Sequence, residues 1–200
     1  MHAIVVVAIM MVLSPAYSAS KTVLVLGDSL SAEYGLKRGD GWVALLEKRL
    51  QEKHINAAIV NASISGETTI GGKTRLPALL QKNHPSIVIV ELGANDGLRG
   101  LPILSTQKNL QEIITLAKKT GARILLIGMQ LPPNYGTDYT RRFAALFPTL
   151  AKQNQTALLP FMFEHIVTRP ELFQADRIHP TAAAHPIILE SIWPQLQPLL

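Results

Sequence analysis

The chain has 200 residues, 48% of them hydrophobic, and a net charge of +5. This length and apolar content fit one globular domain with a sizeable core, so we expect a single domain over residues 19–200. Its Lys and Arg residues are scattered and aromatic residues make up only 6%. That pattern argues against nucleic-acid binding, which uses basic stripes interleaved with aromatics.

The N-terminus carries ten apolar residues, 4–13, followed by small residues over 14–20. Ten residues are too few to span a bilayer, and this order is typical of a secretory signal peptide. Ala16 and Ser18 favour cleavage after Ser18, so we expect residues 1–18 to be removed. The protein would then be periplasmic or secreted, with no integral membrane segment in the mature chain. Because no Lys or Arg precedes the apolar run, a buried first strand or an uncleaved anchor remains an alternative.

Apolar runs and helical spacing alternate along the rest of the chain. The runs predict buried strands over residues 23–26, 57–62, 86–92, 123–129 and 157–159. The spacing predicts helices over 40–50 (capped by Asp40), 74–83, 105–120, 138–153 and from near His179 to Leu196. Pro77 fits only the first turn of its helix, and Pro148 predicts a boundary or kink. This alternation indicates an α/β fold, a parallel sheet covered on both faces.

Ser29 follows the first strand, where a tight Gly-containing turn exposes it. In parallel sheets, functional groups collect beyond the carboxyl ends of the strands. A serine nucleophile needs a base, and the base needs a third group to orient it. The alternative is that Ser29 or Ser31 only caps the next helix.

His179 is the candidate base, because Asp176 precedes it by three residues at a predicted loop-to-helix boundary. A turn brings residues i and i+3 to one side, so Asp176 can accept from Nδ1–H while Nε2 faces outward. In the alternative, Asp176 caps the helix and His179 is merely exposed. The other five histidines, including His185, fit surface or capping positions.

Acyl transfer also needs hydrogen-bond donors for the developing oxyanion. The backbone N–H of Ser29, the backbone N–H of Gly66 and the side-chain amide of Asn95 are suitable donors, although Gly66 and Asn95 equally fit turns. Asp28 and Asp96 are interpreted as structural residues that bond nearby backbone amides.

Four segments together resemble the sequence blocks of the SGNH or GDSL hydrolase superfamily: residues 27–31, 63–68, 93–96 and 176–179. Residues 90–100 and 131–136 further resemble its bacterial periplasmic acyl-CoA thioesterases, also called lysophospholipases, and the related arylesterases. The resemblance implies a flavodoxin-like, three-layer fold with a five-stranded parallel sheet. Glu33 and His185 depart from the Gly and Gln that are frequent in this superfamily.

The resemblance also implies a Ser29–Asp176–His179 triad, no metal or organic cofactor, and activity on acyl thioesters, aryl esters and lysophospholipids. We expect a monomer that acts on such small molecules. The acyl chain is predicted to contact Leu98, Pro132 and Tyr135, together with Leu76, Leu79 and Ile103. The alternatives are a carbohydrate acetylesterase of the same superfamily or a non-catalytic anion-binding α/β module.

Overall fold

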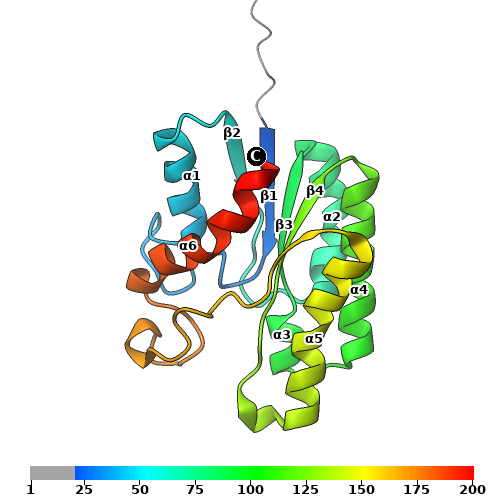
Figure 1. The fold of residues 1–200 in the computed structure, drawn as a ribbon, viewed down its shortest axis with the longest axis vertical. Coiled ribbons are helices and arrows are strands. Elements are labelled where there is room, and N and C mark those ends of the chain that lie inside the picture. Colours follow the sequence, from blue (N-terminus) through cyan, green and yellow to red (C-terminus); the bar gives the residue numbers. More distant parts are fainter. Residues whose placement is uncertain (1–20) are drawn as a thin grey trace, which may run out of the picture.

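Residues 21–200, described by a computed structural model, form a five-stranded parallel sheet with helices on both faces (Figure 1). The strand order is β2 (Ala57–Asn61), β1 (Lys21–Gly27), β3 (Ile87–Glu91), β4 (Arg123–Ile127) and β5 (Ala157–Leu159). The predicted α/β class and all five predicted strands are confirmed. The predicted signal peptide, residues 1–18, lies outside the described residues.

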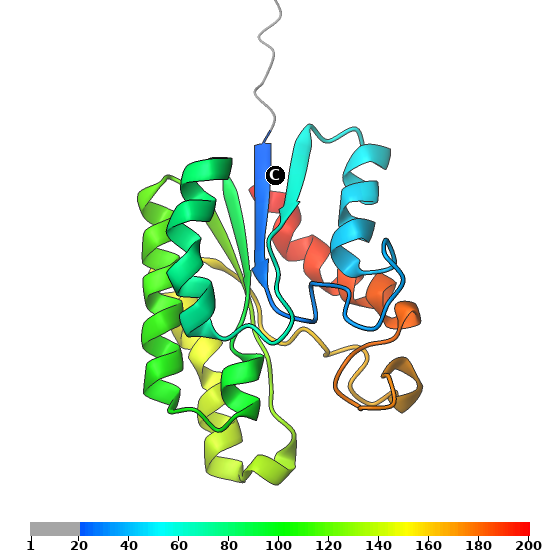
Figure 2. The same ribbon diagram turned by 180° about the vertical axis from the view of Figure 1, so that it is seen from behind.

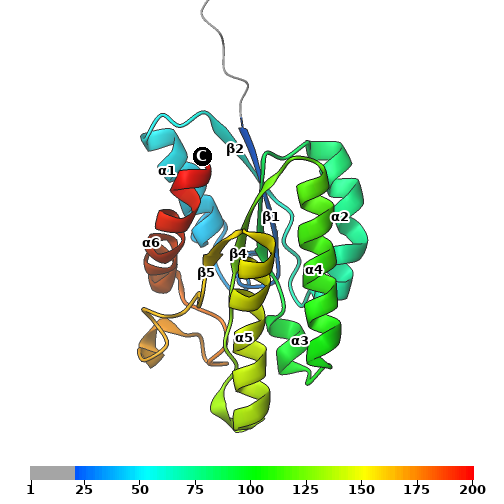
Figure 3. The same ribbon diagram turned by 45° about the vertical axis from the view of Figure 1, so that its right-hand side comes forward.

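The helices form the two outer layers. They are α1 (Trp42–Glu52), α2 (Thr69–Asn83), α4 (Ile103–Lys119), α5 (Thr137–Asn154) and α6 (His185–Leu196), with a short α3 (Ala94–Leu98) after β3. Helices α1 and α6 cover one face of the sheet and α2, α4 and α5 the other (Figures 2 and 3). No helix within residues 21–200 is long and apolar enough to cross a membrane.

Strand β1 lies at the point where the strand order reverses, with β2 on one side and β3 on the other. Parallel strands buried on both faces need continuous apolar side chains, which β1 and β3 supply. Strand β2, expected to be buried, is instead an edge strand whose residues are half-buried or exposed. The carboxyl ends of β1 and β3 therefore form the crevice where such sheets place their sites.

Two helix starts differ from the prediction because distant residues bond to them. Helix α2 begins at Thr69, five residues before the predicted start, so Pro77 lies in its interior rather than its first turn. Asp96 accepts hydrogen bonds from the backbone N–H of Thr69 (2.8 Å) and from its hydroxyl. A carboxylate there satisfies a free helix N–H and complements the helix dipole.

Helix α1 has Gly41, not Asp40, at its N-cap position. The backbone N–H of Trp42 donates to Nδ1 of His185 at 3.0 Å, so a buried histidine from α6 accepts the hydrogen bond that a capping side chain would normally accept. His185 is also the first residue of α6, six positions after His179, which places His179 in a loop.

Helix α5 continues through Pro148, which is therefore not a boundary.

Candidate active site

Ser29 lies two residues beyond β1, at the carboxyl edge of the sheet. The turn depends on Gly27, because an added Cβ would lie 2.8 Å from both Ser31 Oγ and Ser63 Oγ. Real Cβ atoms do not approach other atoms this closely, so only glycine fits between these side chains. Gly27, two residues before Ser29, therefore has a packing role.

A network of buried hydrogen bonds holds this turn in place. Ser31 Oγ donates to Glu91 Oε2 at 2.7 Å and accepts from Trp42 Nε1 at 3.2 Å. Glu91 Oε2 also accepts from the backbone N–H of Asp28 at 3.3 Å. Burial, followed by the charge of Asp28, raises the pKa of Glu91 well above its usual value. The neutral form of Glu91 is thus favoured, which reduces the cost of burying this acid.

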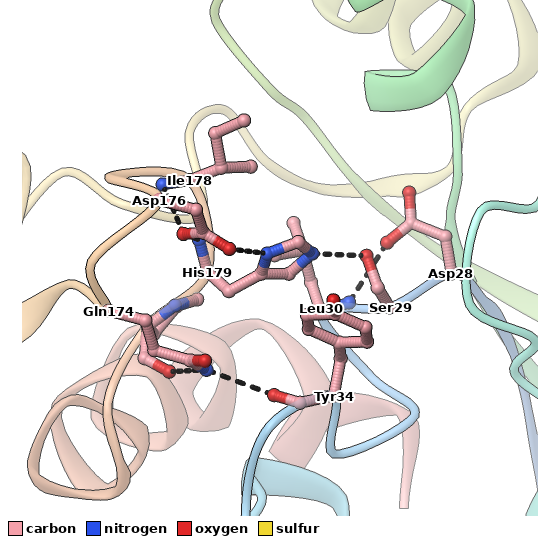
Figure 4. A network of polar contacts seen from close by, with 9 residues as sticks. Asp28, Ser29, Leu30, Tyr34, Gln174, Asp176, Ile178 and His179 are labelled. Atoms are coloured by element: carbon pink, nitrogen blue, oxygen red, sulfur yellow. Dashed lines mark hydrogen bonds and ion pairs between the residues drawn. The ribbon is translucent and has the colours of Figure 1, made fainter.

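His179 joins Ser29 to Asp176 (Figure 4). Nε2 of His179 lies 2.9 Å from Ser29 Oγ, and Nδ1 lies 2.7 Å from Asp176 Oδ2. The other oxygen of Asp176 accepts from the backbone N–H groups of Ile178 (2.9 Å) and His179 (3.0 Å). Desolvation raises the pKa of Asp176, but these hydrogen bonds and those from His179 outweigh it and lower the pKa to about 2. Asp176 is therefore ionised at neutral pH, and it holds His179 from within a loop.

Tyr34 and Gln174 also contact this arrangement, and the sequence analysis missed both. The Tyr34 ring lies against the His179 ring with centroids 4.3 Å apart. Gln174 donates from its backbone N–H to the His179 carbonyl (2.7 Å) and from Nε2 to the Tyr34 carbonyl (2.9 Å; Figure 4). Because Tyr34 and Gln174 are 140 positions apart, no local pattern could have paired them.

Asn95, at the first turn of α3, is held by Asp28. Its Nδ2 donates to Asp28 Oδ2 at 2.9 Å, and the N–H of Leu30 donates to Asp28 Oδ1 at 3.0 Å. Burial raises the pKa of Asp28 to about 6, although these two bonds act in the opposite direction. An amide NH₂ has two hydrogens, so Asn95 keeps one for another acceptor. Asp28 and Asp96 both bond backbone amides, as predicted.

Gly66, the third predicted oxyanion donor, is placed differently from Ser29 and Asn95. Its φ of +78° is in the left-handed region, it is exposed, and its carbonyl accepts from Arg99 Nη2 at 2.9 Å. Unlike Ser29 and Asn95, it does not line the cavity described next. The structure thus brings two of the three predicted oxyanion donors together in one cavity.

A cavity of about 550 Å³ opens beside Ser29 and His179. The lining is largely apolar and consists of Asp28, Ser29, Leu30, Ala94, Asn95, Leu98, Met129, Gln130, Leu131, Pro132, Pro133, Phe161, Phe163, Val167, Pro170, Phe173, Arg177, Ile178 and His179. It draws on the loops after four strands, β1, β3, β4 and β5. The aromatic side is built by Phe161, Phe163 and Phe173, whose rings meet edge to face.

Only two of the six side chains expected along the acyl chain, Leu98 and Pro132, line this cavity. Tyr135 is not among the lining residues. Its hydroxyl donates to the Leu98 carbonyl at 3.0 Å and so ties the 131–136 loop to α3. Leu76 and Ile103 are buried in the core, and Leu79 is half-buried against it. Helical spacing marks a buried face but does not distinguish core from cavity wall.

The described residues, 21–200, contain no group of three or more His, Asp or Glu side chains that could hold a metal ion.

A family model described as the GDSL-like lipase/acylhydrolase family matches residues 25–187. The chain belongs to this family. It is 48% identical over 190 residues to the esterase TesA of Pseudomonas aeruginosa, covering 95% of this chain and 94% of that protein. It is 45% identical to the thioesterase 1/protease 1/lysophospholipase L1 of Escherichia coli (92% and 86% covered) and 44% identical to an arylesterase of Vibrio mimicus (92% and 92% covered).

The fold agrees with this membership. A crystal structure of TesA superposes with a TM-score of 0.88 at 49% identity, covering 90% of this chain and all of that one. The predicted superfamily and its three-layer fold are confirmed.

Proposed function

We propose that this protein hydrolyses acyl esters and thioesters through an acyl-enzyme on Ser29. The observation that carries the proposal is the pair of contacts made by His179, 2.9 Å to Ser29 Oγ and 2.7 Å to Asp176. A hydroxyl, an imidazole and a carboxylate in this order form the arrangement that activates serine in many unrelated hydrolases. Membership in an acylhydrolase family supports the same reaction.

In the proposed first step, Nε2 of His179 takes the proton of Ser29 as Oγ attacks the acyl carbon. Asp176 stabilises the imidazolium. The carbonyl oxygen becomes an oxyanion that accepts from the N–H of Ser29 and the free amide hydrogen of Asn95, with Gly66 as the third donor. The tetrahedral intermediate then breaks its bond to the leaving alcohol or thiol, which takes the proton from His179.

In the second step, water gives its proton to His179 and attacks the acyl-enzyme. The same donors hold the second oxyanion, and its collapse returns the proton to Ser29 Oγ and releases the acid. No side chain changes its net protonation over the cycle, and each bond change uses only Ser29, His179, the substrate and water.

The cavity lining supports the proposal that an acyl or aryl group is the part of the substrate that becomes buried. Its walls are mainly apolar side chains, with Leu, Pro and Phe the most frequent, and these favour apolar groups over sugar hydroxyls. The relatives named esterase, arylesterase and thioesterase/lysophospholipase are consistent with this substrate class. We therefore favour it over deacetylation of carbohydrates.

The direct test is hydrolysis of p-nitrophenyl acyl esters by Ser29→Ala. We expect kcat to fall by about 10⁴-fold or more. Ser105→Ala, at an exposed serine of α4, is the matched control and should keep full activity. A phosphonate ester should label Ser29 in the parent protein, as seen by mass spectrometry. Near-normal turnover by Ser29→Ala, or labelling elsewhere, would overturn the proposal.

We also propose that the protein is exported after removal of residues 1–18, because the apolar run and the small residues after it match a signal peptide. Sequencing the N-terminus of the protein recovered from a bacterial periplasm tests this. We expect Ala19 as the first residue, whereas a chain that still begins at Met1 would contradict export by this route.

A further inference from the structure

Arg177 is the only Lys or Arg among the described residues that line the cavity. It is exposed, and its guanidinium makes no hydrogen bond or ion pair within residues 21–200. Its backbone is also unusual, with φ at +57°, in the left-handed region that favours glycine. An arginine thus occupies a position that is strained for any side chain, without a partner inside the protein.

Glu33 provides a comparison, because it too lies close to the site with a left-handed φ, +60°. Its carboxylate accepts from the backbone N–H groups of Gly39 (3.0 Å) and Gly41 (2.9 Å), which ties the loop to the start of α1. Those bonds offset the strain at Glu33. At Arg177 only the backbone N–H is bonded, to the Gln174 carbonyl at 2.9 Å. Its side chain makes no bond that offsets the strain, and an unpaired side chain at a strained position points to a functional role.

The place of Arg177 indicates which part of a substrate it faces. The leaving group must depart next to Nε2 of His179, which protonates it. Arg177 is two residues from His179 on the same loop, whereas Asn95 lies in α3, after β3. A charge carried by the leaving group therefore lies on the side of the cavity where Arg177 is.

The carboxylates around Arg177 are already engaged. Asp176 is bonded to His179 and to two backbone N–H groups, and Asp28 is bonded to Asn95 and Leu30. Neither forms an ion pair with Arg177. The guanidinium thus remains free for an external anion, and its planar set of donors suits phosphate oxygens.

We propose that Arg177 binds the phosphate of the leaving group and so favours substrates such as lysophospholipids over neutral esters. In a lysophospholipid only a glycerol separates the phosphate from the ester, so both can occupy one cavity mouth. The proposal rests on the proposed function, since it assigns the leaving-group side from the role of His179.

The test compares lysophosphatidic acid (1-acylglycerol 3-phosphate) with 1-monoacylglycerol of the same acyl chain, below the concentration of micelle formation. These substrates share the ester and the glycerol and differ in the phosphate group. In Arg177→Gly we expect KM for the lysophospholipid to rise about 5-fold, the scale of one solvent-exposed charge-assisted contact. For monoacylglycerol we expect a smaller change, so the ratio of the two KM values reports the contact to the phosphate. Glycine suits the left-handed backbone, so the variant should fold at least as stably.

Arg177→Lys should recover part of the preference, and added salt should weaken it in the parent protein. Arg169→Gln is the matched control, because Arg169 is exposed on the same β5–α6 loop but is paired with Glu171 at 3.1 Å. It should leave both KM values unchanged. Acyl-CoA serves as a second phosphate source. If KM in Arg177→Gly rises only for the lysophospholipid, Arg177 recognises the phosphate of a short glycerol leaving group. If KM rises for both substrates, Arg177 recognises phosphate in general.

Equal KM values in Arg177→Gly and the parent protein, or equal rises for the charged and neutral esters, would overturn the proposal. Turnover of monoacylglycerol reports on Ser29 and His179 independently. If the parent protein does not hydrolyse monoacylglycerol, the proposed function is contradicted, and not only the role of Arg177.

Discussion

The two loops that meet at Ser29 and His179 are built differently. On the β1–α1 loop, Asp28 and Ser31 are 1% and 2% exposed and bond to residues of the sheet and of α1. On the β5–α6 loop, the Asp176 side chain is 39% exposed, and its partners are all within three residues of it. On one side of the site the polar side chains are bonded into the core, whereas on the other Asp176 is held only by residues next to it in the chain.

This difference predicts that the two loops respond differently to substitution. Removing a buried polar partner leaves another buried group unpaired and lowers the free energy of unfolding. When an exposed polar partner is removed, water replaces its hydrogen bonds, so the catalytic rate falls and the free energy of unfolding hardly changes.

Asp176→Asn should affect activity and hardly affect stability. An amide cannot stabilise the imidazolium and favours the wrong tautomer of His179, so kcat should fall by about 10⁴-fold. The melting temperature should change little, because the side chain is 39% exposed. Asp138→Asn, which removes an exposed ion pair with Arg141, is the control. A large drop in melting temperature for Asp176→Asn alone would show that this loop is not independent of the core.

Asn95→Ala tests a residue of α3 that belongs to neither the β1–α1 loop nor the β5–α6 loop. We expect kcat to fall about 10²- to 10³-fold with little change in KM, because the amide hydrogen that is not bonded to Asp28 would contact the substrate only at the oxyanion. Stopped-flow and steady-state assays on p-nitrophenyl esters measure both constants. A rise in KM with kcat intact would instead make Asn95 a residue that positions the substrate.

His185 makes the buried side sensitive to acid. Burial lowers the pKa of His185 from 6.5 to about 4, although the charges of Glu33 and Asp40 act against this. The pKa of His185 is lower in the folded protein than in the unfolded chain. The contribution of neutral His185 to stability is therefore complete above pH 6.5 and is lost as the pH falls towards 4. The loss approaches about 3 kcal/mol. Its cause is that burial disfavours the charged imidazolium. A protonated Nδ1 also cannot accept from the Trp42 N–H.

His185→Gln isolates this effect, because the amide oxygen can accept the same hydrogen bond and does not titrate. Urea unfolding of both proteins at pH 7.5 and pH 4.5 gives the comparison. Other buried acids, such as Asp28, titrate equally in both proteins and cancel in the difference. If the two proteins lose the same stability on acidification, His185 is not the sensor.

Ser31→Ala should lower the free energy of unfolding by about 2 kcal/mol, since it leaves Glu91 and Trp42 Nε1 without their shared partner. The kcat of the folded fraction should stay within a few-fold of the parent. Denaturant titration measures the first and assays at low temperature the second. Ser105→Ala provides the exposed comparison, and an equal change in both variants would remove the basis for calling the network stabilising.

Several features of the site followed from the sequence alone because their causes are local. Five apolar runs bounded by turns can all be buried as strands of a parallel sheet, and such a sheet brings the carboxyl ends of its strands to one edge. Asp176 and His179 are three residues apart, so a single turn pairs them without help from the rest of the chain. Sequence therefore indicated the pairing and the edge of the sheet at which it lies.

The tertiary structure decided what depends on residues far apart in the chain. His179 and Ser29 are 150 positions apart, and His185 and Trp42 are 143 apart, so their hydrogen bonds exist only because the loops and helices pack as they do. Likewise Asp96 sets the start of α2 from another loop, and Tyr135 bonds a carbonyl instead of lining the cavity. Periodicity reports whether a side chain is buried, whereas its partner is determined by packing.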